Sequence, residues 1–137
     1  MKIEHFALNV SEPVAMTDWY VQHLGLTLIK QMAEAPFTTF LADDSGRVMI
    51  EIYNNPADQV PAYQTLDPLI LHLAFVSTNP AADKERLLQA GASLQSETDL
   101  ADGTQLVMLR DPWGLAIQLC KRATPMLTEL EKLSVFQ

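Results

Sequence analysis

The sequence has few of the residues that several classes of protein require. Its single cysteine, Cys120, excludes an intramolecular disulfide and is typical of a reducing compartment. Nine lysine and arginine residues stand against 17 acidic ones, so the net charge of −8 makes nucleic acid a poor candidate partner. No apolar run approaches the roughly 20 residues of a membrane span, and Met1 leads almost directly into a strand-like segment, which leaves no room for a signal peptide. We therefore expect a cytoplasmic protein with no nucleic-acid or membrane partner.

One order of elements is predicted twice along the 137 residues: strand, helix, strand, strand, strand. A chain that is 48% hydrophobic and 19% charged can build a core around them. Alternation and turn residues predict strands over 3–10, 26–34, 36–42 and 48–53, and again over 69–76, 92–97, 104–109 and 115–120. In the first half a helix follows an N-cap at Ser11 and ends at Gly25; in the second, a helix begins at Asn79-Pro80 and ends at Gly91. A long period that occurs twice indicates a duplicated module.

This repeat sets the expected domain organisation. We predict a single domain over 1–137 made of two modules, 1–54 and 69–122. The segment 55–68 contains three prolines and several polar residues, which is typical of a linker. Residues 123–137 form a predicted C-terminal helical tail, which packs either on its own chain or on a second subunit.

Four polar residues occupy equivalent positions in the two halves. His5 and His72 are 67 positions apart, and so are Glu51 and Gln118. The uninterrupted run Leu69–Val76 predicts a strand buried on both faces around His72. Period-two alternation sets all four side chains opposite an apolar face, beside small alanines, which is how a ligand cleft is lined.

Two imidazoles, a carboxylate and an amide oxygen can converge on one divalent metal. The absence of a thiolate from this set disfavours iron–sulfur chemistry and suits Zn, Ni, Co, Mn or Fe(II). The alternative is a set of hydrogen-bonded side chains left from a metal-binding ancestor. Met49 and Tyr53 flank Glu51 in period two and are candidate substrate-binding residues. Cys120 is a third, with an inert buried thiol as its alternative.

Five segments carry a resemblance to a known family: IEHFALNV, WYVQHLGL, VMIEIY, LHLAFV and RDPWGLAIQL. Together they resemble the vicinal oxygen chelate superfamily, which includes glyoxalase I, bleomycin-resistance proteins and extradiol dioxygenases. The Asp-Pro-x-Gly turn before the last strand is the most specific of these motifs. The resemblance implies an α+β fold of two βαβββ modules that form an open, barrel-like mixed sheet with helices outside. It also implies metal ligation by His5, Glu51, His72 and Gln118.

Gln118 departs from the pattern of glyoxalase I, which usually has a glutamate at this position. An amide cannot accept a proton as a general base near neutral pH, so the catalytic proton carrier would be Glu51. The resemblance then implies a metal-dependent isomerase, epimerase or lyase that acts on a small oxygenated molecule through a metal-chelated, enediolate-like intermediate.

Two other activities stay open. One is a small-molecule binding or drug-sequestering protein of the bleomycin-resistance type. The other is an extradiol-type dioxygenase, since His5, His72 and Glu51 have the composition of its metal site. We expect a homodimer in each case. Arg47 and Arg110 lie beside turns and are either solvated or in contact with an anionic substrate.

Overall fold

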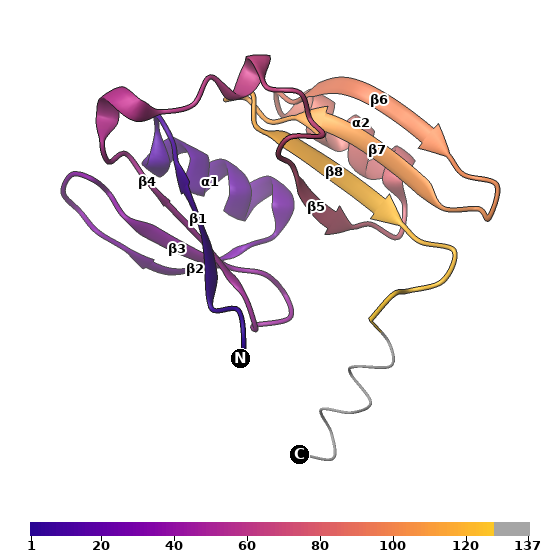
Figure 1. Cartoon of the computed structure of the whole chain (residues 1–137), viewed down its shortest axis with the longest axis horizontal. Coiled ribbons are helices and arrows are strands. Elements are labelled where there is room, and N and C mark those ends of the chain that lie inside the picture. Colours follow the sequence, from indigo (N-terminus) through magenta and orange to yellow (C-terminus); the bar gives the residue numbers. More distant parts are fainter. Residues whose placement is uncertain (128–137) are drawn as a thin grey trace. The chain divides into compact units, whose positions relative to one another are not determined.

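The chain divides into two compact units, Met1–Ala62 (unit 1) and Tyr63–Gln137 (unit 2). A computed structural model describes residues 1–127 (Figure 1). Residues 55–62 of the predicted linker therefore belong to unit 1, and 63–68 belong to unit 2. Of the predicted helical tail over 123–137, residues 123–127 are described and are not helical, and residues 128–137 lie outside the described residues.

Unit 1 is a βαβββ module with one four-stranded mixed sheet. The sheet order is β1-β4-β3-β2, with β1 parallel to β4 and the other neighbours antiparallel. The elements are β1 (His5–Asn9), α1 (Pro13–Leu24), β2 (Thr27–Gln31), β3 (Thr39–Ala42) and β4 (Met49–Tyr53). A short 3-10 helix, Ala57–Gln59, follows β4.

Unit 2 repeats this module in the order β5-β8-β7-β6, again with one parallel pair, β5 and β8. A 3-10 turn, Tyr63–Thr65, precedes the repeat. Its elements are β5 (Leu73–Val76), α2 (Pro80–Gln89), β6 (Ser93–Asp99), β7 (Gln105–Arg110) and β8 (Ala116–Lys121). The predicted α+β class with two βαβββ modules is confirmed, as two four-stranded mixed sheets.

The pairing of strands follows the same register in both units. His5 pairs with Met49 and Leu73 pairs with Ile117, and the partners are 44 positions apart in each case. The turn between the last two strands is one residue longer in unit 1, because Ala42 pairs with Met49 whereas Arg110 pairs with Ala116. The 67-residue repeat read from the sequence is thus present in the hydrogen bonding of the backbone.

Each helix covers one face of its own sheet (Figure 1). In unit 1 the covered face carries Leu8, Leu41 and Ile52, which are buried with Met16 and Tyr20 of α1. In unit 2 the corresponding core contains Leu87 of α2 and a set of strand residues, Val107, Leu109, Ile117 and Leu119. We call the opposite face of each sheet its distal face, and Glu51 and Gln118 lie on it because strand residues alternate between faces.

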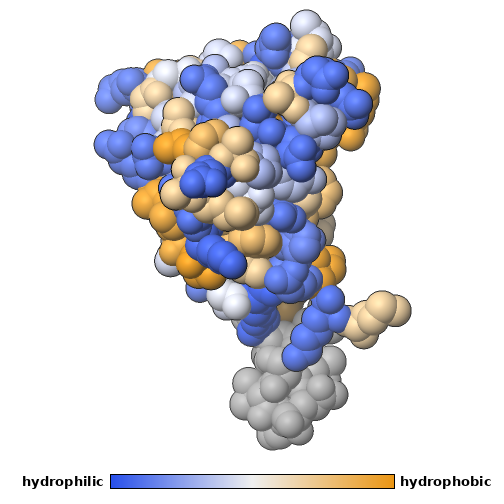
Figure 2. Space-filling model, turned by 90° about the vertical axis from the view of Figure 1, so that its left-hand side faces the viewer, coloured by the Kyte–Doolittle hydropathy of each residue, from blue (hydrophilic) through white to orange (hydrophobic). Residues whose placement is uncertain are grey.

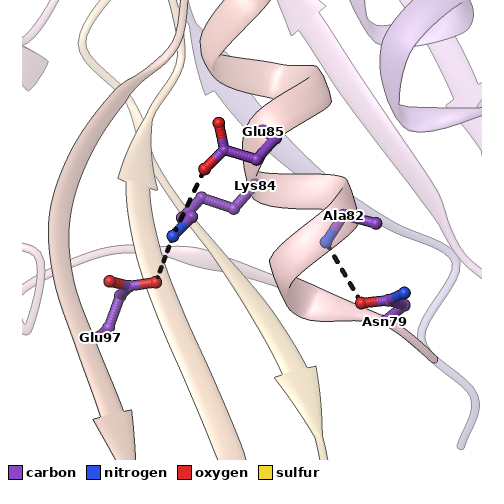
Figure 3. A network of polar contacts seen from close by, with 5 residues as sticks. All are labelled: Asn79, Ala82, Lys84, Glu85 and Glu97. Atoms are coloured by element: carbon purple, nitrogen blue, oxygen red, sulfur yellow. Dashed lines mark hydrogen bonds and ion pairs between the residues drawn. The ribbon is translucent and has the colours of Figure 1, made fainter.

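The helix ends follow the sequence signals in most places. Gly25 ends α1 in the left-handed conformation, with φ of 71°. The side chain of Asn79 caps α2 by accepting from the backbone N–H of Ala82 at 3.2 Å, and Lys84 joins α2 to β6 through Glu97 at 2.7 Å (Figure 3). Ser11 was the wrong N-cap for α1, because the helix begins at Pro13 and its N-cap is Glu12, without a side-chain bond.

The predicted strand over 69–76 is wrong in its first half and in its burial. Leu69 and Ile70 are 83% and 72% exposed, and the strand begins only at Leu73. Asp67 accounts for this, because its side chain and its carbonyl accept the N–H groups of Leu69 and Ile70, at 2.9 Å each, and so form a turn. Neither helix within residues 1–127 is long and apolar enough to span a membrane.

Candidate functional site

Unit 1 brings His5 and Glu51 into direct contact. The two side chains come from the parallel neighbours β1 and β4, and Nε2 of His5 lies 3.0 Å from Oε2 of Glu51. Ala7 is the direct cross-strand partner of Glu51, and its small side chain leaves room for this diagonal contact. The imidazole is 37% exposed and the carboxylate 17%, so a ligand can reach both. The ring of Phe40 meets the imidazole edge-on, at 5.8 Å between centroids.

Two carboxylates act on the charge of His5. Nδ1 contacts the carboxylate of Glu4, and this hydrogen bond is the largest influence that raises the pKa of His5 above its ordinary value of 6.5. Partial burial lowers the pKa of the ring, whereas the negative charges of Glu4 and Glu51 raise it. Because only a deprotonated nitrogen binds a metal, an incoming metal would have to displace the proton of Nε2.

In unit 2, His72 is held by a backbone carbonyl. It lies immediately before β5, and its Nδ1 is 2.8 Å from the carbonyl oxygen of Pro68. A carbonyl only accepts hydrogen bonds, so Nδ1 is the protonated nitrogen. With the proton on Nδ1, a neutral imidazole presents the lone pair of Nε2, and this is the form that ligates metals.

Gln118 lies on the distal face of unit 2, at the position that Glu51 has in unit 1. Its cross-strand partner on β5 is Ala74, two residues after His72. Oε1 of Gln118 accepts from the thiol of Cys120 at 3.2 Å, and Met108 faces Gln118 from β7. Gln118 thus has the strand position of Glu51, whereas His72 lies just before β5 and His5 is the first residue of β1.

The predicted substrate-binding residues lie on the same faces. Met49 and Tyr53 are half-buried and share the distal face of β4 with Glu51. Cys120 is 7% exposed, beside Gln118 on β8. Burial raises the pKa of its thiol above 9.0, and the nearby charge of Arg122 only partly opposes this, so the thiol is protonated at neutral pH.

The donor types of the two pairs fit a metal that prefers nitrogen and oxygen ligands. Within residues 1–127, no three side chains of His, Cys, Asp or Glu are gathered closely enough to hold a metal ion. Each unit by itself supplies two candidate donors, and Gln118 is of none of those four types.

Reasoning from the sequence missed three groups around these histidines. Glu4 directly precedes His5, and this adjacency was a signal that could have identified it. The carbonyl of Pro68 leaves no signal in the sequence, because every residue carries one. Arg110 is half-buried, and its guanidinium donates to the carbonyls of Tyr63, Leu66 and Gly114, which the sequence did not indicate.

The Asp-Pro-Trp-Gly turn before β8 owes its form to a buried carboxylate. Oδ1 of Asp111, which is 3% exposed, accepts from the backbone N–H groups of Trp113 and Leu115 at 2.9 Å each. Gly114 has a φ of 90°, which favours glycine. This turn fixes the start of the strand that carries Gln118.

On the face shown in Figure 2, hydrophobic and hydrophilic residues are interspersed. Exposed apolar side chains of unit 1 include Phe6, Leu28 and Ile29. Single exposed apolar residues are ordinary on protein surfaces. The candidate site is therefore defined by its polar side chains.

Several solved structures resemble this chain. The antibiotic-binding protein TnmS3 from Streptomyces sp. CB03234 is 19% identical, with a TM-score of 0.67 over 87% of this chain and 93% of that one. A lactoylglutathione lyase from Agrobacterium tumefaciens is 18% identical, with a TM-score of 0.63 over 88% of this chain and 93% of that one. A superfamily member from Sphaerobacter thermophilus DSM 20745 is 12% identical, with a TM-score of 0.68 over 89% and 98%. At these identities the likeness concerns the fold.

No curated protein matches the sequence. Residues 2–119, which include all four candidate ligands, match a single family. The chain belongs to the glyoxalase/bleomycin resistance protein/dioxygenase superfamily.

Proposed function

We propose that this protein is a metal-dependent, glyoxalase-like isomerase, epimerase or lyase that acts on a small oxygenated molecule. Members of the superfamily typically use a divalent metal. The proposed ligands are His5, Glu51, His72 and Gln118. The observation that carries the proposal is the 3.0 Å contact between Nε2 of His5 and Oε2 of Glu51.

The repeated register adds support from the second unit. Gln118 pairs with Ala74 as Glu51 pairs with Ala7, and His72 directly precedes β5, whereas His5 is the first residue of β1. The carbonyl of Pro68 leaves Nε2 as the basic nitrogen of His72. Both units therefore contribute one imidazole and one oxygen donor of the kind that Zn, Ni, Co, Mn or Fe(II) accepts.

Glu51 is the proposed proton carrier of the reaction. When bound, the metal would act as a Lewis acid that polarises oxygens of the substrate. Glu51 is the carboxylate among the four proposed ligands, and Oε2 is the atom we assign to take and return the proton. Met49 and Tyr53, on the same strand face, would contact the body of the substrate.

Metal analysis tests this proposal directly. Protein purified without chelator should contain about one first-row divalent metal per chain, and His72→Ala should lose it. His23→Ala is the matched control, because His23 is the third histidine of the chain and lies on α1. Wild-type protein that takes up no metal at any pH, or a His72→Ala variant that keeps its metal, contradicts the proposal.

A second candidate function is binding of a small molecule without turnover. Gln118 favours it, because the amide cannot serve as a general base. The similar structure of TnmS3 is that of an antibiotic-binding protein, and we propose such a ligand here only as this alternative. Tight binding of a hydrophobic antibiotic by metal-free protein, with equal affinity in Glu51→Gln, would favour it.

A further inference from the structure

Arg110 forms an unusual set of contacts for an arginine at the end of a strand. Its Nη1 atom donates to the carbonyl of Tyr63 at 2.8 Å and to that of Gly114 at 3.0 Å. Its Nη2 atom donates to the carbonyl of Leu66 at 2.7 Å. Hydrogen bonds from a charged donor are stronger than neutral ones, and the planar guanidinium fixes their directions. Arg110 thus ties the segment 63–66 to the turn between β7 and β8.

Close packing at Gly114 holds the same segment in place. A Cβ atom added at Gly114 would lie 2.6 Å from both Cβ and the backbone nitrogen of Gln64. Real Cβ atoms do not approach backbone atoms so closely. The segment therefore rests directly on the turn and cannot move toward it.

The chain from Leu66 to His72 continues as a series of short-range hydrogen bonds. The N–H of Leu66 donates to the carbonyl of Tyr63 at 3.2 Å. Asp67 then accepts from the two residues after Pro68, through its side chain and its carbonyl. Pro68 lies within this turn, and its carbonyl accepts from Nδ1 of His72 at 2.8 Å.

We propose that Arg110 is a positioning residue for His72, which acts through the 63–70 segment on the carbonyl of Pro68. By holding that carbonyl against Nδ1, Arg110 keeps the ring proton on Nδ1 and the lone pair on Nε2. The part of this inference that concerns metal rests on the proposed function. The part that concerns the ring proton does not.

The effect on a metal follows from the tautomer. A neutral imidazole with its proton on Nε2 cannot ligate through Nε2. Partners that orient a ligating histidine typically contribute about 10–100-fold in metal affinity. We expect the loss of Arg110 to have an effect near the lower end of this range, because Arg110 acts on the ring through a segment of backbone.

Arg110→Lys is the test variant, because lysine keeps the positive charge but lacks the planar guanidinium that donates to several carbonyls at once. The ¹⁵N chemical shifts of the His72 ring, measured in metal-free protein at about pH 8.5, report which nitrogen carries the proton. In wild-type protein the ring proton should be on Nδ1. In Arg110→Lys a substantial fraction of the rings should carry it on Nε2. Titration with Co²⁺ should then give an affinity roughly tenfold weaker. Arg47→Lys, in the exposed turn between β3 and β4, is the matched control and should equal wild type in both measurements.

A folded Arg110→Lys variant whose His72 proton stays on Nδ1 overturns the inference. If that variant does not fold, Asp67→Ala decides, because Asp67 is exposed and its loss frees the N–H of Leu69. This variant should shift the ring proton in the same sense, and an unchanged ring contradicts the inference equally. Wild-type protein that binds no Co²⁺ refutes the proposed function, and the ring measurement alone then decides the role of Arg110.

Discussion

The two units share a backbone plan and differ in what surrounds their histidines. Strand pairing has the same register in both, and the histidines are 67 positions apart. His5 lies between two carboxylates, whereas His72 is bonded to a neutral carbonyl. The comparison teaches that duplication repeats the positions of ligand candidates, while the neighbouring side chains set the charge of each one separately.

The two histidines therefore differ in how strongly protons compete with a metal for the ring nitrogen. The carboxylates around His5 favour its protonated form, and the pKa of His5 is raised. A metal that binds His5 must then displace a proton over a wider pH range. The neutral carbonyl at His72 fixes a tautomer without adding negative charge.

The largest predicted effect concerns the oxygen donors of the two units. Glu51→Gln gives unit 1 the amide of unit 2, and we expect kcat to fall about 10²–10⁴-fold because this variant lacks the proposed proton carrier. Gln118→Glu makes the opposite exchange and should tighten binding of Zn²⁺, since a carboxylate is the stronger ligand. Steady-state kinetics and metal titration measure the two effects. A Glu51→Gln variant with wild-type turnover would contradict the assignment.

The turns before the last strands should differ in what they contribute to stability. Asp111→Ala leaves two backbone N–H groups without their acceptor in a buried turn, which should cost roughly 2–4 kcal/mol of unfolding free energy. Asp43→Ala removes an exposed carboxylate that accepts from Ser45 and should cost about 0.5 kcal/mol. Urea denaturation measures both variants. Equal losses would show that burial of the turn is not what distinguishes the units.

The N-termini of the two helices should differ less in their contribution to stability. Asn79→Ala removes the side-chain cap of α2, and we expect a loss of about 1 kcal/mol. Ser11→Ala should change stability by only a few tenths of a kcal/mol, because α1 has no side-chain cap. Thermal unfolding of the two variants checks this difference, and a larger loss from Ser11→Ala would contradict the observed cap.

The smallest expected change comes from Glu4. Glu4→Gln should lower the pKa of His5, since the hydrogen bond to Glu4 is the main cause that raises it. A raised pKa in the folded state stabilises the protein below the ordinary value of 6.5, and this contribution disappears as the pH rises through the raised pKa. The stability difference between wild type and Glu4→Gln should therefore shrink with increasing pH. NMR titration of the His5 ring measures the shift, with Glu85→Gln as an exposed control.

Much of the fold could be predicted because its signals are local. Alternation, turn residues and one apolar run identified the eight strands found within residues 1–127, and Gly25 and Asn79 marked helix ends where the structure has them. The apolar stretch 69–71 misled the prediction, because one carboxylate and one carbonyl of Asp67 are sufficient to form a turn there. Hydrophobicity alone does not report such a competing hydrogen bond.

The surroundings of the candidate site could be predicted only in part. The repeat indicated which side chains are equivalent, and His5 and Glu51 are in contact. Arg110 could not have been assigned, because its partners are backbone carbonyls and those of Tyr63 and Leu66 lie 47 and 44 positions away. Backbone partners carry no residue type that a sequence could display.

The contact between Gly114 and Gln64 constrains anyone who wishes to re-engineer this protein. There is no room for even a methyl group at Gly114. The turn before β8 and the segment that leads toward His72 would therefore have to be exchanged together. Loops grafted from a relative would have to replace both segments together, because a change in one of them alone would disturb their close contact at Gly114.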